Sequence, residues 1–415
     1  MKVFKFGGAS IKDSAAIRNV ASIIKDHEHQ PLLVVISALG KTTNALERML
    51  ALHSAGGDYG TEIEALHDQH AQIAVELLDR PEHLLSELNT LCVQIEQHLA
   101  RPSDPDKTYD QIVSLGEVMS SLIVSHYLQS VGLNCIWKDA RELIRTDATF
   151  REGIVDWAQT EKLVYPLGAI LQTGTLVITQ GFIASDGQGN STTLGREGSD
   201  FSAAIFASSL HAESVTIWKD VPGVMSADPK RIPAAVVFEE LPYKEAAEMT
   251  YYGASVIHPK TIRPLALNGI PLYVKSFADP TLPGTKIHEC KVDHLPPVIV
   301  FKDNQCLLSC KVTDYTFVNE QQMGSILHAL SELGIRLNVM QNSAISFSFC
   351  IDFRERKMEA LIERLQQEFE VYYNTNLTLI TIKNYDDQVF EKYRRQPGVL
   401  LEQSSRSTLQ VLVRG

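Results

Sequence analysis

Short apolar runs alternate with helical patterns over the first 276 residues of the chain. The run Leu32–Ile36 is apolar throughout, which suits a strand buried on both faces of a parallel sheet. Ile17, Val20, Ala21 and Ile24 recur at the spacing of one helical face. We therefore predict an α/β domain whose mostly parallel sheet lies between helices. Its expected strands are Val3–Phe6, Leu32–Ser37, Leu133–Trp137, Leu176–Ile183, Val215–Trp218 and Pro271–Lys275.

Residues 44–100 interrupt this alternation. They carry many charges and show helical periodicity with little strand pattern, which predicts a helical insertion. Two interpretations stay open, because such an insertion either covers a cleft or serves as plain scaffold.

The pattern changes after a segment rich in proline and glycine between residues 279 and 297, which marks a domain boundary. Strand and helix patterns then follow the order β-α-β-β-α-β of a ferredoxin-like unit. A shorter second copy follows and lacks a final helix and strand. The expected elements are strand 298–312, helix 319–333, strands 336–340 and 345–353, helix 355–369, strand 376–383, helix 386–395, and strands 398–402 and 407–413. The predicted domains are residues 1–283, 298–375 and 376–415.

The composition narrows the class of protein. Among the 415 residues, 44% are hydrophobic and 21% charged, as in soluble globular proteins. The net charge of −12 argues against nucleic acid as a partner, because no basic surface would replace phosphate counterions. The chain begins directly in a predicted strand, and no apolar run reaches the roughly 18 residues of a membrane span. We therefore expect a cytoplasmic protein that does not bind membranes.

Cysteine and histidine give no sign of a metal site. The six cysteines are scattered and mostly lie in apolar runs, so we expect reduced thiols. His67 and His70 share a face of a helix that looks solvated. No metal-binding residues are predicted.

The first predicted strand runs into a glycine turn. Lys5 is followed by Phe6, Gly7, Gly8, Ala9 and Ser10, and then by a helix. Two glycines at a strand-to-helix turn let the backbone approach a ligand closely, and a helix start attracts phosphate. Lys5 adds a full positive charge beside the turn. This pattern favours a phosphate site, with an ordinary tight turn as the alternative from these residues alone.

A second glycine-rich segment, Leu194–Asp200, also precedes a helix. Asp200 is either the cap of that helix or a group that positions Lys5 or reaches a metal-bound phosphate through water. The loop Ser37–Asn44 follows another strand with small residues and hydroxyls. All three loops follow the carboxyl ends of predicted strands, where open α/β sheets bind ligands.

Glu117 and Arg196 indicate the kind of molecule that is bound. Glu117 follows a glycine near the expected start of a helix, where a surface acid is the plain alternative. An acid and an arginine in one pocket would pair with the ammonium and the carboxylate of an α-amino acid. Segments 218–223 and 227–230 either hold a ribose and base or simply turn the chain.

Six segments resemble, in order and spacing, those of the amino acid kinase fold, and more narrowly those of aspartate kinases with ACT domains. They are KFGGAS, VVISALGKTTN, SLGEVMSS, TQGFIASDGQGNSTTLGREGSD, WKDVPGVMSADPK and YYGASVIHPKTI. The resemblance implies transfer of the γ-phosphoryl group of MgATP to the β-carboxylate of L-aspartate, which gives 4-phospho-L-aspartate. That reaction is the first step toward lysine, threonine and methionine.

The resemblance also assigns roles to single residues, with ATP and Mg²⁺ as the implied cofactors. The implied catalytic and phosphate-binding residues are Lys5, Asp200, Gly7, Gly8 and Ser10. The implied substrate-binding residues are Ser37, Thr43, Glu117, Arg196 and Ser199. The implied nucleotide-binding residues are Lys219, Asp220, Lys230 and Ser255.

Three positions depart from the family pattern. Ala9 replaces a threonine, Glu197 replaces a glycine beside the phosphates, and Ser255 replaces a lysine that contacts nucleotide, for which Lys219 or Lys260 would compensate. These departures keep open a sensor that has lost catalysis. A sister kinase acting on glutamate, acetylglutamate or a nucleoside monophosphate is the other alternative, against which Glu117 and Arg196 weigh.

The C-terminal repeat implies regulation. ACT domains commonly bind an amino acid effector between subunits, and here lysine is the first candidate and threonine the second. The residues in the matching region are Met323, Gly324, Asn338, Asn342 and Ser343. Core packing is the alternative explanation for these positions. Exposed sheet edges favour a homodimer or a higher homo-oligomer formed through these domains.

Overall fold

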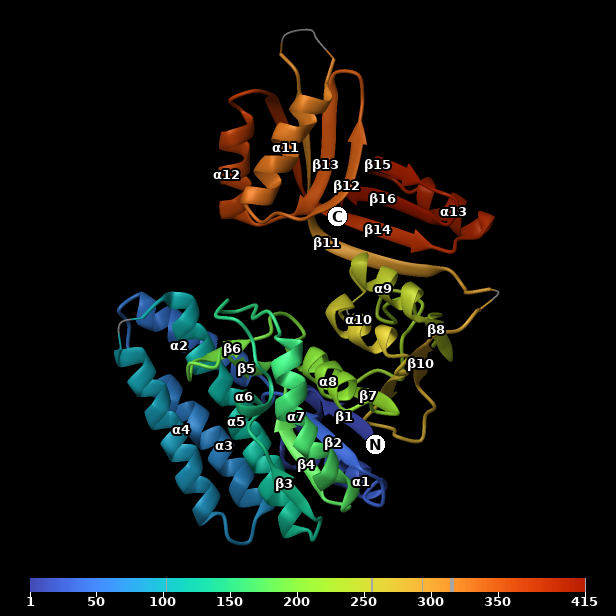
Figure 1. The fold of residues 1–415 in the computed structure, drawn as a ribbon. Coiled ribbons are helices and arrows are strands. Elements are labelled where there is room, and N and C mark those ends of the chain that lie inside the picture. Colours follow the sequence, from blue (N-terminus) through green and yellow to red (C-terminus); the bar gives the residue numbers. More distant parts are fainter. Residues whose placement is uncertain (102, 255–256, 293, 314–316, 415) are drawn as a thin grey trace. The chain divides into compact units, whose positions relative to one another are not determined.

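The computed structural model describes residues 1–101, 103–254, 257–292, 294–313 and 317–414. They form two compact units, coloured mostly blue to yellow and orange to red in Figure 1. The first unit comprises Met1–Val224, Val237–Ala247 and Val256–Val292. The second comprises Met225–Val236, Glu248–Ser255 and Asp293–Gly415. The domain boundaries that the sequence indicates stay predictions.

An eight-stranded sheet in the order β3-β4-β2-β1-β7-β9-β10-β8 forms the centre of the first unit. Every pairing in it is parallel except that of β9 with β10. This confirms the predicted mostly parallel sheet. The strands are β1 Lys2–Phe6, β2 Leu32–Ile36, β3 Cys135–Trp137, β4 Leu176–Gln180, β7 Ser214–Lys219, β8 Glu240–Pro242, β9 Leu272–Ser276 and β10 Thr285–His288, and β5 Ile183–Ser185 and β6 Ser191–Thr193 form a separate ribbon.

Helices cover the sheet because the central strands bury both faces. All five residues of β2 are buried, as its unbroken apolar run predicts. The helices of the first unit are α1 Ser14–Lys25, α2 Thr42–Ser54, α3 Gly60–Leu77, α4 Glu82–Ala100, α5 Pro105–Ser130, α6 Ala140–Leu143, α7 Trp157–Gln172, α8 Gly198–Ser209 and α10 Pro259–Leu267. Helix α9 Tyr243–Tyr251 begins in the first unit and ends in the second. The short 3₁₀ helix η1 (Gly8–Ile11) follows β1 directly.

The stretch 44–100 is helical, as predicted, and forms α2, α3 and α4. These helices pack with α5 into a layer on one side of the unit (Figure 1). Asp104 caps α5 through its side chain, and Pro105 occupies the first turn, where no amide hydrogen is needed. The sequence-based position of Glu117 near a helix start is wrong, because α5 begins twelve residues earlier and buries Glu117 in its middle.

A six-stranded antiparallel sheet in the order β12-β13-β11-β14-β16-β15 forms the second unit. Its strands are β11 Val298–Lys311, β12 Leu337–Asn342, β13 Ser346–Asp352, β14 Glu370–Lys383, β15 Val399–Ser404 and β16 Thr408–Arg414, and its helices are α11 Glu320–Glu332, α12 Glu355–Leu365 and α13 Asp387–Arg394. The predicted tandem of ferredoxin-like repeats is confirmed, with one difference. Both repeats use β11 and β14, whose register shifts between Lys302 and Leu307.

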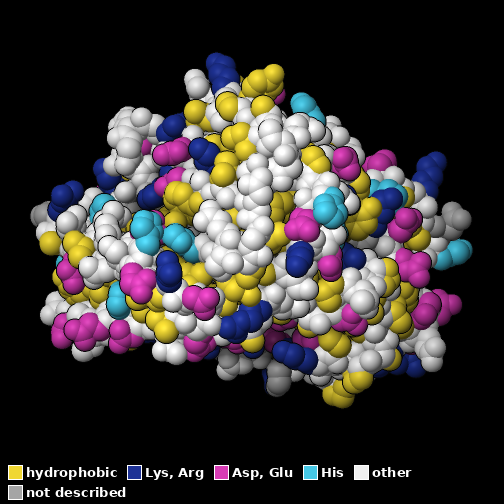
Figure 2. All heavy atoms as spheres, turned by 90° about the horizontal axis from the view of Figure 1, so that it is seen from below, with side chains coloured by type: hydrophobic (Ala, Val, Ile, Leu, Met, Phe, Trp, Pro, Cys, Tyr) yellow, Lys and Arg dark blue, Asp and Glu magenta, His cyan; other side chains and the backbone are white. Residues whose placement is uncertain are grey.

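No helix among the described residues has both the length and the apolar character needed to cross a membrane. On the face drawn in Figure 2, Lys and Arg side chains are interspersed with Asp and Glu.

Candidate active site

The carboxyl ends of β1, β2 and β7 lie side by side at the middle of the first sheet. Lys5 is the last residue but one of β1, and it pairs with Val35 of β2 and Ile217 of β7. The order of the strands along the chain reverses at β1, and open α/β sheets bind ligands at such a point. The predicted phosphate turn therefore stands at the expected place in the sheet.

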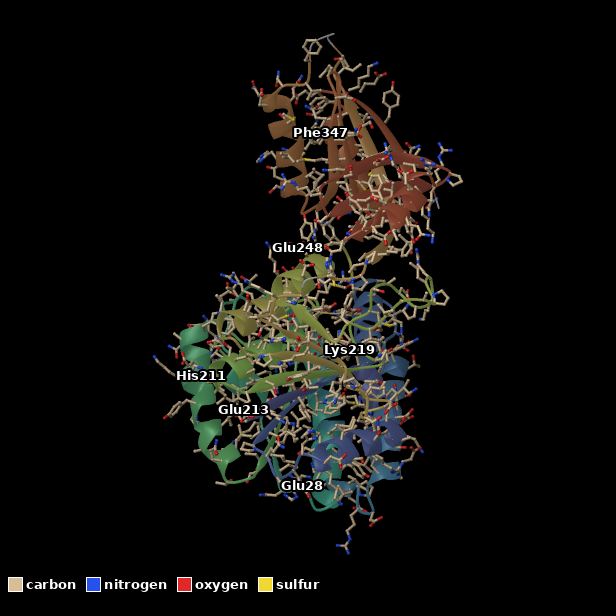
Figure 3. All side chains as sticks on the ribbon, turned by 90° about the vertical axis from the view of Figure 1, so that its right-hand side faces the viewer. Glu28, His211, Glu213, Lys219, Glu248 and Phe347 are labelled. Carbon is tan, nitrogen blue, oxygen red and sulfur yellow. The ribbon has the colours of Figure 1, made fainter. Side chains whose placement is uncertain are left out.

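Lys5 is paired with Asp200 of α8. The Nζ of Lys5 lies 2.6 Å from Oδ1 of Asp200, and the Nζ of Lys219 lies 3.4 Å from Oδ2. Burial raises the pKa of Asp200, but Lys5 and Lys219 lower it by more, so it lies below its ordinary value. Asp200 is thus an anion that holds two ammonium groups together at the end of β1. Figure 3 labels Lys219, which ends β7.

The glycine turn after β1 leaves no space for a side chain at its second glycine. A methyl group on Gly8 would lie 2.6 Å from the carbonyl oxygen of Ala38. The carbonyl of Gly8 accepts a hydrogen bond from the amide of Gly40, at 3.1 Å. Gly8 therefore joins the turn after β1 to the turn after β2. The buried hydroxyl of Ser10 faces the carbonyl of Trp218, at 3.5 Å.

A cavity of about 630 Å³ opens beside this turn. It is lined by six of the residues that the sequence predicts, which come from four separate segments. They are Gly8, Ser37, Thr43, Glu117, Arg196 and Ser199. The predicted ion pair of Lys5 with Asp200 adjoins it, since Ser199 and Asp200 are consecutive in α8. The structure thus brings the acid and the arginine into one pocket.

Glu117 is a buried carboxyl group of this pocket with a strongly raised pKa. It is 3% exposed, and its burial raises the pKa to about 8 although the Ala38 amide and Lys5 lower it. Its Oε2 accepts no hydrogen bond from any described residue. A buried acceptor without a partner is costly, so this oxygen is suited to a cationic or hydrogen-bonding ligand group. The ammonium of an amino acid meets that need.

Several lining residues were missed by the sequence analysis. They are Tyr109, Arg151, Glu152, Phe182 and Thr193. The guanidinium of Arg151 lies 4.1 Å from the centre of the Tyr109 ring, and Arg151 and Glu197 have positive φ angles of 67° and 55°. The sequence could have indicated Thr193, because the hydroxyl residues Ser191–Thr193 follow a glycine-rich turn and such a short polar strand suits the wall of a pocket. Nothing in the sequence singles out Tyr109 or Arg151.

Asp110 of α5 fastens one wall of this pocket. Its side chain accepts hydrogen bonds from the amide of Arg151 at 2.8 Å, from the amide of Thr193 at 2.9 Å and from the hydroxyl of Thr193 at 2.8 Å. Burial raises the pKa of Asp110 despite these bonds. Because α5 also carries Glu117, Asp110 ties the acid side of the pocket to the wall that contains Arg151 and Thr193.

The predicted nucleotide residues belong to different parts of the chain. Lys219 contacts Asp200, and Asp220 follows it as an exposed residue. Lys230 is exposed and belongs to the second unit. Ser255 lies outside the described residues. Lys260 lines a different cavity of about 560 Å³ that also includes Arg263 and Trp157.

The predicted effector residues lie around α11 and β12. Gly324 is exposed in the first turns of α11, and Met323 packs against the core that contains Phe347. Phe347 is labelled in Figure 3. Asn342 and Ser343 are exposed at the end of β12. Asn338 is held by Lys302, Gln305 and Asp352, with bonds of 2.9, 2.7 and 3.0 Å. Its amide is therefore already engaged within the second unit.

Comparison with known proteins identifies the family of this chain. The amino acid kinase family matches residues 1–276, so the chain belongs to the amino acid kinase family. Within that family the relatives it resembles are aspartokinases. It is 34% identical to the lysine-sensitive aspartokinase 3 of Escherichia coli over 84% of this chain and 78% of that protein.

Two further comparisons extend this result. The chain is 32% identical over 382 residues to a chloroplastic bifunctional aspartokinase/homoserine dehydrogenase 2 of Arabidopsis thaliana, and it spans only 42% of that protein. It superposes on E. coli aspartokinase III in complex with aspartate and ADP with a TM-score of 0.85 at 28% identity, covering 100% of this chain and 96% of the other. The lysine and aspartate complex of the same enzyme gives a TM-score of 0.83.

Proposed function

We propose that this chain phosphorylates the β-carboxylate of L-aspartate with ATP and yields 4-phospho-L-aspartate and ADP. The observation that carries the proposal is the convergence of Glu117 and Arg196 in one cavity beside the paired Lys5 and Asp200. The similarity to E. coli aspartokinase III, solved with aspartate and ADP, supports the same substrates. Such an activity would supply the first intermediate toward lysine, threonine and methionine.

The chemistry needs positioning and positive charge more than it needs a base. A side-chain carboxylate has a pKa of about 4, so aspartate is already a nucleophile at neutral pH. The difficulty lies in bringing that anion to a triphosphate, and phosphoryl transfer is accelerated mainly by stabilising charge. Lys5 and Lys219 supply two ammonium groups, and Asp200 keeps both at the end of β1. Arg196 would orient the α-carboxylate of the substrate, and Glu117 its ammonium.

Mg²⁺ would accompany the nucleotide. Magnesium is usually held by one or two carboxylates together with substrate phosphates, and it neutralises their charge. Glu197 lines the cavity, and its buried Oε2 accepts no hydrogen bond from the described residues. A carboxylate oxygen without a partner beside the phosphate turn fits a divalent cation. Glu197 is therefore the group on this wall that would hold it.

The activity is tested by trapping the acyl phosphate with hydroxylamine while ADP release is followed. L-Aspartate should give both signals, whereas glutamate, acetylglutamate and UMP should give neither. Lys5→Ala should lower kcat by about 10²- to 10³-fold, because it removes charge from the transition state. Turnover of a different acceptor would contradict the proposed substrate. Wild-type-like turnover of Lys5→Ala would contradict the role of Lys5.

Regulation by an amino acid is the second part of the proposal. The relative in E. coli is named lysine-sensitive, and its structure was solved with lysine, which supports lysine ahead of threonine as effector. The exposed edge strand β12 would pair with a second subunit. Free cysteines at all six positions fit a cytoplasmic location. Inhibition assays with lysine and threonine, together with light scattering, test these points, and insensitivity to both amino acids would remove the effector site.

A further inference from the structure

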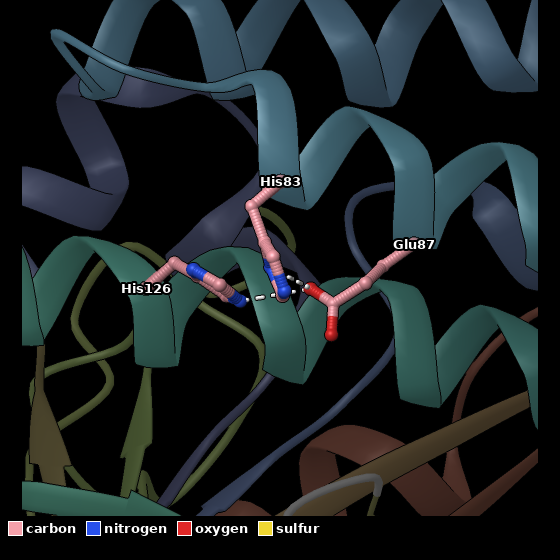
Figure 4. Close-up of side chains that lie close together, drawn as sticks. All are labelled: His83, Glu87 and His126. Carbon is pink, nitrogen blue, oxygen red and sulfur yellow. Dashed lines mark hydrogen bonds and ion pairs between the residues drawn. The ribbon is translucent and has the colours of Figure 1, made fainter.

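Two histidines and a glutamate converge on the helical layer of the first unit, outside the site described above. His83 and Glu87 lie one turn apart on α4, and His126 lies on the neighbouring helix α5 (Figure 4). The Oε2 of Glu87 is 2.9 Å from Nε2 of His126 and 3.5 Å from Nδ1 of His83. The imidazole rings of the two histidines are 5.6 Å apart.

The spacing of these atoms matches a tetrahedral metal site. Zinc binds imidazole nitrogen and carboxylate oxygen at about 2.0–2.2 Å, which places two ligands of a tetrahedron about 3.4 Å apart. The distances of 2.9 and 3.5 Å in this cluster lie on either side of that value. One ligand atom from each of the three residues lies within 4.8 Å of the other two. Small rotations of the side chains would bring all three to one ion.

We propose that His83, Glu87 and His126 form a binding site for a divalent transition metal, of which Zn²⁺ is the best match. Two imidazoles and one carboxylate are a zinc donor set, whereas Mg²⁺ and Ca²⁺ prefer oxygen ligands alone. Three protein ligands leave a fourth position for water. The side chain of His83 is 78% exposed, so the ion reaches the site from solvent, while Glu87 and His126 are 34% and 27% exposed.

The bound ion would join α4 to α5 across their packed faces. Since α5 carries Glu117, the ion would fasten the inserted helices to the helix that supplies the acid of the pocket. Without the ion, the same three residues form hydrogen bonds or ion pairs with one another. Measuring whether the protein takes up a metal at this cluster therefore distinguishes a metal site from a set of ion pairs.

The test is a zinc titration of chelator-stripped protein, followed by calorimetry and by the visible absorption of Co²⁺ as a substitute. A second cluster of Glu240, His288 and Cys290 has a similar donor set. Titrations are therefore made in a Cys290→Ser background. One equivalent per chain is expected, with a tetrahedral Co²⁺ spectrum. His83→Gln and His126→Gln should each weaken zinc binding by more than about tenfold. Loss of a residue that only hydrogen-bonds to a metal ligand already costs about tenfold in affinity, and loss of a ligand should cost more.

His67→Gln is the matched control. His67 lies on α3 of the same layer and also contacts an acid, Asp68, but no third ligand completes a metal cluster there among the described residues. It should bind zinc as the parent protein does. If His126→Gln fails to fold by circular dichroism, the exposed His83→Gln gives the same information. The proposal would be overturned if the parent protein took up no zinc. It would also be overturned if His83→Gln and Glu87→Gln took up zinc as well as the parent protein does.

Discussion

Glu117 shows how one buried carboxyl group links ligand binding to pH. Its pKa of about 8 lies above the ordinary value of 4.5, so the folded chain retains a proton that the unfolded chain releases. Stability should therefore fall as pH rises through this interval, by up to about 1.4 kcal/mol per pH unit. Urea denaturation across the interval should show a shallower fall for Glu117→Gln. Subtracting the pH dependence of the variant from that of the parent protein isolates the contribution of Glu117. This matters because His70, whose pKa is lowered, makes stability rise with pH.

The same group makes a prediction about aspartate. An ammonium placed beside Glu117 favours its charged form, so aspartate binding below about pH 8 should release a proton. Calorimetry in buffers of different ionisation enthalpy would measure it. Glu117→Gln should bind aspartate more weakly and without proton release. Equal proton release in both proteins would place the ammonium elsewhere.

Glu197 combines backbone strain with a carboxylate oxygen, Oε2, that accepts no hydrogen bond from the described residues. Its φ of 55° is left-handed, which costs a residue with a side chain about 1 kcal/mol and glycine nothing. Glu197→Gly should therefore raise the free energy of unfolding by about that amount, whereas Glu197→Ala keeps the strain. Both variants remove the carboxylate, so both should weaken the Mg²⁺ dependence of ADP binding, measured by calorimetry. An unchanged dependence would remove Glu197 from the metal site.

At the scale of elements, the contact between the turns after β1 and β2 is the most sensitive to a small change. A methyl group on Gly8 would meet the backbone oxygen of Ala38, which cannot move without disturbing β2. Gly8→Ala should cost about 1–3 kcal/mol in stability and weaken ADP binding. Gly168→Ala in α7 is the control, because its nearest atom, Cδ2 of Leu210, is 3.9 Å away. That variant should match the parent protein or exceed its stability by up to about 1 kcal/mol.

Asp110 provides a second test between elements. Asp110→Ala leaves the buried amide of Thr193 and the partly buried amide of Arg151 without an acceptor, which should cost about 1–3 kcal/mol. The KM for aspartate should rise because the pocket wall loses its attachment to α5. Denaturation and steady-state kinetics measure the two effects. A loss of stability with an unchanged KM would show that this wall does not position the substrate.

At the scale of the whole molecule, the second unit behaves as one sheet with two repeats. The first part of β11 pairs with the second part of β14, which in turn pairs with β16. The predicted boundary at residue 376 falls within β14. A chain that ends at Asn376 should therefore expose Ile299 and Phe301, which pack against Ile380 and Val411. Dye binding and size-exclusion chromatography should show aggregation, and a cooperative, monodisperse second unit would contradict the shared sheet.

Local pattern was sufficient for most elements and for the site's main residues. Leu32–Ile36 is apolar without interruption, and β2 is buried on both faces. Glycines beside Lys5 and Asp200 mark loops that the parallel sheet brings to one edge, since all strand ends of one direction meet there. Chain order and residue type therefore indicated the loops of the site, and the resemblance to aspartate kinases gave Lys5, Asp200, Glu117 and Arg196 their roles.

The remaining features depend on contacts between residues far apart in the sequence. Asp110 holds Arg151 at the pocket through a hydrogen bond to its amide, and the meeting of His83 with His126 depends on the packing of α4 against α5. Periodicity reports which face of an element is apolar, but not which other element covers it. The amino-acid sequence by itself determined the α/β order, the phosphate turn and the repeat. Only the tertiary structure decided the burial that raises the pKa of Glu117 and the strands that the two repeats share, because both arise from neighbours that local pattern does not specify.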